Sequence, residues 1–125
     1  MSGPEQAVAT MLQAVNAHDL EAVAALATGN ERFRESHRRM LAAFPDVHLE
    51  LQWTVTEADK CVAWCRIQGT HQGEWRGIAP TGRPIDVLGM MTLQVDHHGM
   101  VTDFWLVNDW LTIATQIGAT LQPPT

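Results

Sequence analysis

The spacing of hydrophobic residues changes once along the chain, from a helical repeat to a strand repeat. In the first third of the chain they recur every three or four positions, as on one face of an α-helix. This pattern predicts helices at 4–15, 19–29 and 30–44. Asp19 and Asn30 are favoured N-cap residues for the second and third helices, and Pro45 ends the third.

In the second part of the chain the repeat shortens to two. Residues 49–55 alternate between apolar and polar side chains, which marks a half-buried β-strand. Further elements are expected as strands at 61–71, 85–95 and 100–109 and as a last helical turn at 110–117. Three helices followed by an antiparallel meander predict an α+β fold with the helices on one side of the sheet. No internal repeat or linker is found, so residues 1–125 are expected to form a single domain.

Composition narrows the class of protein. Eight Lys and Arg against 14 Asp and Glu give a formal charge of −6, and no basic run is interleaved with aromatic residues. We therefore expect no nucleic-acid partner. The N-terminal residues lack the features of a signal peptide, and no run reaches the roughly 18 apolar residues of a membrane helix, so no membrane partner is expected. These features favour a cytoplasmic protein.

The two cysteines are expected to stay reduced. Cys61 and Cys65 are four positions apart in a predicted strand, which separates them by about 13 Å. This distance is too long for a disulfide, and no second pair of ligands completes a zinc site. Reduced cysteines also suit the cytoplasm.

The segment 69–83 contains the most specific motif of the chain. It reads GTHQGEWRGIAPTGR, which resembles the G-T-H-x-G-x-x-x-G-x-x-P-T-G-[RK] segment of SnoaL-like proteins, the family of polyketide cyclases and so-called ester cyclases. Four shorter stretches agree with the same family in order and spacing, at 16–19, 43–46, 105–109 and 116–118. The resemblance implies the nuclear-transport-factor-like fold, a cone-shaped barrel of three N-terminal helices packed on a curved antiparallel sheet.

The resemblance also implies a chemistry. Polyketide cyclases of this family close a ring by an intramolecular aldol reaction, without metal or organic cofactor, and use an aspartate as the acid/base. The family's aspartate and its histidine partner fall at Leu106 and near Thr92 of this chain. This pair is therefore absent, and the candidates come from other polar residues.

Asp109 is the leading catalytic candidate. Alternation places it on the same face of the last strand as Trp105 and Val107. If this face lines the cone, burial among apolar groups should raise the pKa of Asp109 toward a value suited to acid/base catalysis. The alternative is that Asp109 is the N-cap of the helix that begins at Trp110.

His37 and Arg66 are the other catalytic candidates. His37 lies in the apolar stripe of the third helix and is expected to face the sheet, either as a group that contacts substrate or as a hydrogen-bonded core residue. Arg66 could stabilise an enolate, pair with a buried carboxylate, or extend to an interface.

Three tryptophans indicate what kind of molecule could bind. Trp53, Trp64 and Trp105 each occupy the apolar face of a different strand, and they are expected to line a cavity for a flat apolar molecule or else to fill the core. The remaining substrate contacts are expected from Phe33, His71, Met91 and Asn108. For His71 the alternative is that it braces the glycine-rich connection.

Together these residues predict a cofactor-independent cyclase or isomerase, which transfers a proton next to a carbonyl of a polyketide-like or polycyclic apolar substrate. Two alternatives stay open: a hydratase, dehydratase or hydroxylation accessory protein with the same pocket, and a non-catalytic small-molecule binding or dimerisation module. A homodimer through the convex face of the sheet is expected, because Ala63, Cys65 and Ile67 make the opposite face of the second strand apolar too.

Overall fold

The computed structural model describes residues 3–120 and 122–124, and it has the α+β architecture that the sequence predicts. Its elements are α1 (Gly3–Asn16), α2 (Leu20–Ala24), a 3₁₀ turn (Ala25–Ala27), α3 (Glu31–Ala43), β1 (His48–Glu57), β2 (Lys60–Thr70), β3 (Pro84–Val95), β4 (Val101–Asn108) and α4 (Trp110–Gln116). Asp19 accepts a hydrogen bond from the backbone N–H of Ala22, and Asn30 accepts one from that of Phe33. Both predicted N-caps are therefore confirmed.

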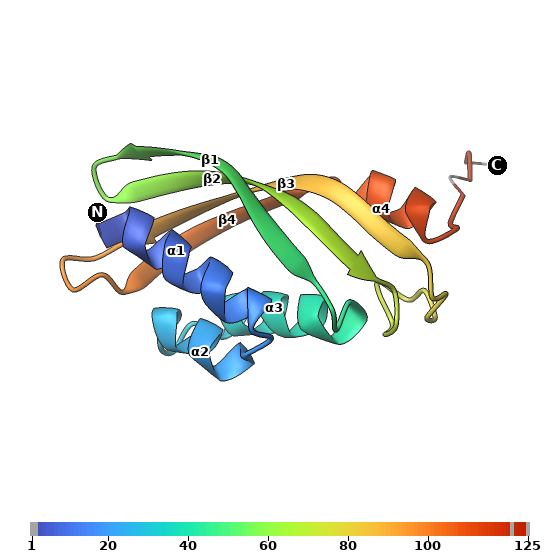
Figure 1. Ribbon diagram of the computed structural model, residues 1–125, viewed down its shortest axis with the longest axis horizontal. Coiled ribbons are helices and arrows are strands. Elements are labelled where there is room, and N and C mark those ends of the chain that lie inside the picture. The colour runs from blue at the N-terminus through green and yellow to red at the C-terminus, as the bar shows by residue number, and fades with distance from the viewer. Residues whose placement is uncertain (1–2, 121, 125) are drawn as a thin grey trace.

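The strands form one antiparallel sheet in the order β1-β2-β3-β4. The sheet bends over α1, α2 and α3, which all cover the same face, while α4 lies apart from them at one end of the sheet (Figure 1). Gln116 ties α4 to β3, because its amide oxygen accepts from the N–H of Asp86 over 2.8 Å and its NH₂ donates to the carbonyl of Asp86 over 3.0 Å. Within the described residues, no helix has the length and apolar character needed to cross a membrane.

Short polar stretches join these elements. The side-chain amide of Asn16 pairs with both backbone groups of Leu49, at 2.7 and 2.9 Å, and so links the end of α1 to β1. Asp46 accepts hydrogen bonds from the N–H and the hydroxyl of Thr70, both at 2.7 Å, and so links the end of β2 to the connection before β1. Asn16, Asp46 and Gln116 all belong to the stretches that carry the family resemblance. Those stretches therefore specify the fold.

The inner face of the sheet, which the helices cover, forms the core. On β2 it consists of Cys61, Ala63, Cys65 and Ile67, none of them more than 7% exposed. Each large side chain buried here contributes about 1.5–3 kcal/mol to stability. The expectation that Ala63, Cys65 and Ile67 form an outer dimer face is therefore wrong. The two cysteines are both free and buried, as predicted.

The outer face of the sheet carries the tryptophans. Trp53 and Trp105 are 46% and 45% exposed, and Trp64 is half-buried under Trp53, with their rings stacked at 6.0 Å. The prediction that these side chains line the cavity is wrong, because the helices pack on the opposite face. At Val62 and Trp64 the outer face of β2 is as apolar as the inner one, so alternation there does not tell which face is inside.

A β-bulge at Gln52 moves the apolar side chains of β1 from the inner face to the outer face. Leu51 pairs with Cys65 and Trp53 pairs with Trp64, so Gln52 has no partner across the ladder. One extra residue exchanges the faces of every side chain that follows it. Leu49, before the bulge, is therefore buried in the core, whereas Trp53 lies on the outer face.

Candidate functional site

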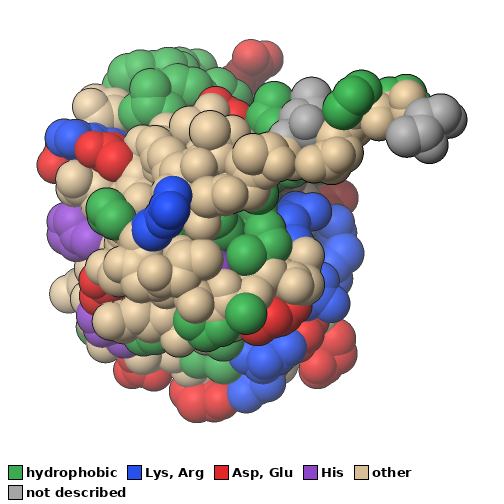
Figure 2. Space-filling view, turned by 90° about the vertical axis from the view of Figure 1, so that its right-hand side faces the viewer, with side chains coloured by type: hydrophobic (Ala, Val, Ile, Leu, Met, Phe, Trp, Pro, Cys, Tyr) green, Lys and Arg blue, Asp and Glu red, His purple; other side chains and the backbone are tan. Residues whose placement is uncertain are grey.

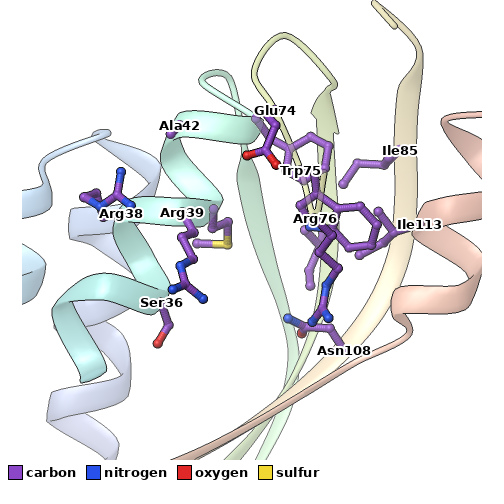
Figure 3. A pocket seen from close by; sticks show the side chains of 13 residues that line it. Ser36, Arg38, Arg39, Ala42, Glu74, Trp75, Arg76, Ile85, Asn108 and Ile113 are labelled. Carbon is purple, nitrogen blue, oxygen red and sulfur yellow. The ribbon is translucent and has the colours of Figure 1, made fainter. Parts of the chain in front are cut away.

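A cavity lies between α3, the inner face of the sheet, the connection at 71–83 and α4. Its wider part, here called the entrance cleft, has a volume of about 470 Å³ and is bordered by the side chains in Figure 3. A narrower part, the inner chamber, adds about 70 Å³. Four residues border both parts: Ser36, Met40, Ile67 and Asn108. The two volumes together fall within the roughly 300–1,000 Å³ of small-molecule sites.

Helix α3 presents His37 to the inner chamber. The imidazole is 3% exposed and packs against the ring of Phe33, with centroids 4.5 Å apart. Nδ1 lies 2.8 Å from the carbonyl oxygen of Phe33, and because a carbonyl can only accept, Nδ1–H is the donor. Burial lowers the pKa of His37 from its ordinary value of 6.5, so the ring is neutral at pH 7. The free lone pair is therefore on Nε2.

Nε2 of His37 is open to the inner chamber. Within the described residues it makes no hydrogen bond. It is also not fully buried, because among these residues the one fully buried side-chain nitrogen or oxygen without a hydrogen-bond partner is Nε2 of His71. The chamber around it is largely apolar, with Met11, Met91 and Leu106 among its lining residues. A neutral imidazole with a fixed tautomer and an accessible lone pair is a suitable proton acceptor.

Strands β3 and β4 supply the opposite wall. Asn108 pairs with Gly89, where a Cβ would lie 2.6 Å from Oδ1 of Asn108 and 2.7 Å from Cδ1 of Ile67. The missing side chain therefore lets both groups approach the sheet. The amide of Asn108 makes no hydrogen bond within the described residues, so its NH₂ is available to a ligand. Met91, which is expected from the sequence to contact substrate, lines the chamber. Cys65 lines it too, but burial raises the pKa of its thiol to about 11, which leaves it protonated.

The glycine-rich motif holds the connection at 71–83 against α3. The N–H of Gly73 donates to the carbonyl of Ala43, and a Cβ on Gly73 would lie 1.9 Å from the carbonyl oxygen of Ala42, so only glycine fits. His71 is fully buried, and its Nδ1 accepts from the N–H of Thr81 over 3.2 Å. His71 therefore braces the connection, as its alternative interpretation proposed, and it does not border the cavity.

A two-residue hairpin in this connection reaches over the entrance cleft. Trp75 and Ile78 exchange backbone hydrogen bonds of 3.0 and 2.8 Å across a turn made by Arg76 and Gly77. Both turn residues have positive φ, 49° and 83°, which defines a type I′ turn. The side chain of Arg76 extends from this turn toward Asn108 (Figure 3).

Asp109 does not occupy the predicted environment. Its carboxylate accepts hydrogen bonds from the N–H and the hydroxyl of Thr112, at 3.0 and 2.6 Å, and so caps α4. These bonds lower the pKa of Asp109, whose side chain is exposed. The prediction of an inward carboxyl with a raised pKa is wrong, and the N-cap alternative is confirmed. The reason is that β4 ends at Asn108 and that Trp105 and Val107 belong to the outer face.

The other predicted residues divide between the core and the outer face. Arg66 lies on the outer face in an exposed ion pair with Asp86, so it is not placed to stabilise an enolate in the cavity. Phe33 is part of the core beneath His37 and does not border the cavity. Leu106, at the family's aspartate position, lines the inner chamber, whereas Thr92 pairs with Trp105 on the outer face.

Several cavity residues escaped the sequence analysis. They are Ser36, Met40, Ile67, Trp75, Arg76, Gly89 and Ile113. Met40 could have been found from His37, since it follows it by three positions on the same helix, and Ser36 could have been found from Met40, which it precedes by four. The turn at 76–77 gave no comparable signal, because Arg-Gly is not one of the dipeptides typical of a two-residue hairpin turn.

Known structures share this fold. AclR of Streptomyces galilaeus, a proposed hydroxylase, superposes with a TM-score of 0.84 at 22% identity over 97% of this chain and 84% of its own. IdmH of Streptomyces antibioticus, a proposed polyketide cyclase, gives 0.76 at 25% identity over 93% and 99%. TsrD of Streptomyces laurentii gives 0.81 at 25% identity over 94% and 96%. Among curated proteins there was no match.

Fold and cavity together define a small α+β protein with a pocket between its third helix and a curved sheet. The family model of the SnoaL-like polyketide cyclases matches residues 3–117, and the chain belongs to this family. The protein is accordingly an enzyme with a general cyclase-type role.

Proposed function

We propose that this protein is a cofactor-independent cyclase in which His37, not Asp109, transfers the proton. The observation that carries the proposal is the fixed tautomer of His37. Its Nδ1–H is held by the carbonyl of Phe33, and the lone pair of Nε2 is open to the inner chamber. No acidic side chain lines this chamber within the described residues, which leaves His37 as its base.

The reaction proposed is an intramolecular aldol closure. Nε2 takes a proton from the carbon next to a carbonyl, which gives an enolate and an imidazolium. The enolate carbon attacks a second carbonyl of the same molecule, so that one carbon–carbon bond forms and an alkoxide results. The imidazolium then returns its proton to this alkoxide, and His37 is neutral again. No oxidant, reductant or further reactant is needed.

Two neighbouring features support this chemistry. The NH₂ group of Asn108 can donate to the oxygen on which the enolate charge develops, because nothing in the described chain occupies it. The lining of the chamber is largely apolar, and apolar surroundings strengthen such a hydrogen bond. The family's aspartate position is part of this lining, as Leu106.

Proton abstraction can be tested without the natural substrate. The probe is methyl 4-oxo-4-(naphthalen-2-yl)butanoate, whose CH₂ next to the ketone exchanges hydrogen for deuterium in D₂O, followed by NMR. His37→Asn keeps a donor for the Phe33 carbonyl but removes the base, so the catalysed exchange rate should fall by about 10²–10⁴-fold. His97→Asn, in an exposed turn, should leave the rate unchanged. Wild-type exchange in His37→Asn, or no catalysed exchange by the protein, would refute the proposal.

The pH dependence of the same exchange identifies the base. Protonation of Nε2 removes the lone pair, and burial lowers the pKa of His37 below 6.5. The catalysed rate should therefore stay level as the pH falls from about 8 past 6.5, and decline only at lower pH. A decline centred above 6.5 would assign the base to another group.

A further inference from the structure

Arg76 is the cationic side chain at the entrance cleft without an acidic partner. Arg38 and Arg39, also at the cleft, both bind the carboxylate of Glu35, with contacts of 2.6 to 3.1 Å. Glu74 borders the cleft as well, but its Oε1 accepts from the backbone N–H of Gly77. Within the described residues, Arg76 forms no ion pair.

The position of Arg76 is fixed by aromatic rings. Its guanidinium carbon lies 5.2 Å from the ring centroid of Trp75 and 5.9 Å from that of Trp110. Both distances lie within the roughly 6 Å of a cation–π contact. The N–H groups of Arg76 make no hydrogen bond within the described residues, and a guanidinium can bind an anion with two parallel hydrogen bonds.

The backbone at Arg76 is strained. Its φ of 49° lies in the left-handed region, where residues with a side chain are disfavoured and where this turn type prefers Asn, Asp or Gly. Backbone strain of this kind points to a role in binding or catalysis. Arg76 is exposed, and its side chain borders the cleft (Figure 3).

The charged side chains around the cleft are suited to an anionic ligand. In a protein with a formal charge of −6, the cleft is bordered by three arginines and one glutamate. The face of the molecule shown in Figure 2 has Lys and Arg side chains along one side, with Asp and Glu side chains among them and hydrophobic surface beside them. Apolar side chains, among them Ile85 and Ile113, form the floor.

We infer that the substrate is an apolar molecule with one carboxylate, which Arg76 binds at the entrance while the apolar part reaches toward His37. This inference rests on the proposed function for its statement that the apolar end of the substrate reacts, but the binding of the carboxylate can be measured separately. Arg76 is then a specificity-determining residue, which selects acids over the corresponding esters.

A matched pair of probes tests the inference. The acid 4-oxo-4-(naphthalen-2-yl)butanoate and its methyl ester share one skeleton and differ by the charge. Isothermal titration calorimetry should show the acid binding about tenfold more tightly or better, the usual effect of a hydrogen bond to a charged group. Arg76→Gln should abolish this preference, and Arg76→Lys should retain part of it. Arg32→Gln removes a positive charge outside the cavity and should leave the preference unchanged.

Each outcome bears on one proposal. Equal binding of acid and ester, no binding of the acid, or an unchanged preference in Arg76→Gln would overturn the inference about Arg76. The proposed function would still stand if the ester exchanged its protons in a manner dependent on His37. Conversely, a preference for the acid that depends on Arg76, without any exchange, would support the binding site and refute the catalysis. Thermal unfolding of each variant confirms that it is folded.

Discussion

The two faces of the sheet differ in a way that the sequence conceals. The inner face of β2 carries small and aliphatic groups, such as Ala63 and Cys65, and it is almost fully buried. The outer face carries three of the five tryptophans, including Trp53 and Trp105, which are nearly half exposed. Size and hydrophobicity would assign these faces the other way round.

The physical reason lies in the space that the helices leave. Small side chains on the inner face allow α1 and α3 to approach the sheet and still leave a cavity beside His37. Indole rings on that face would fill the cavity. The apolar outer face is then not part of the core, and its exposure calls for another explanation. This contrast can be tested one residue at a time.

The largest effect on stability is expected when aspartate replaces one or the other of two adjacent residues of β2. Ala63→Asp buries an unpaired carboxylate in the core and should lower the free energy of unfolding by about 3–5 kcal/mol. Val62→Asp places the same group on the half-buried outer face and should cost about 1 kcal/mol or less. Urea denaturation at one protein concentration measures both. Equal losses would mean that the two faces are not distinguished as the structure indicates.

A second, smaller effect concerns association. The homodimer predicted from the sequence stays a prediction, and we propose the outer face as its surface, because Trp53, Leu88, Trp105 and Val107 are exposed there. A patch of this kind can pair with its own copy across a two-fold axis. Trp105→Asp should weaken the dimer by about 2–4 kcal/mol, the range of aromatic hot spots, because it places charge within the patch.

Sedimentation velocity at micromolar concentration measures this association. The control is Leu111→Asp, which changes an equally exposed apolar residue, 47% against 45%, on α4 instead of the sheet. It should leave the dimer intact. A wild-type protein that sediments as a monomer, or two variants with the same behaviour, would contradict the assignment of the outer face.

The elements themselves could be predicted because their signals are local. Periodicity, the N-caps Asp19 and Asn30, and Pro45 fixed the helices, and the resemblance of the segment 69–83 indicated the family. His37 was found because a helix shows its buried stripe directly in its spacing. The inner face of the sheet was not identified, because apolar residues on both sides of β2 do not indicate which side faces the helices. The bulge at Gln52 also exchanges the two faces within β1.

The candidate site was only half predictable for a related reason. Asp109 was chosen from strand alternation, but the strand ends one residue earlier and its carboxylate caps a helix. Arg76 was missed because it reaches the cavity from a turn, whose placement depends on long-range contacts such as that of Gly73 with Ala43. Residues that act from turns become visible only once the fold is known.

The smallest effect expected is a gain in stability at Arg76. The left-handed backbone conformation costs a residue with a side chain about 1 kcal/mol or more, and Asn-Gly is the preferred sequence of a type I′ turn. Arg76→Asn should recover about 1 kcal/mol of this strain and lose about 0.5 kcal/mol of contact with the indoles, because the guanidinium is exposed. The net gain in the free energy of unfolding is about 0.5 kcal/mol, measurable by urea denaturation with replicate curves.

Gly77→Ala is the matched control for this gain. It changes the other turn residue, whose φ of 83° suits glycine, and should lower the free energy of unfolding by about 1 kcal/mol. Opposite signs for the two substitutions would show that the turn tolerates Arg76 at a cost in stability. If Arg76→Asn destabilised the protein instead, Arg76 would be a packing residue, and the case for its role at the entrance cleft would lose the argument from strain.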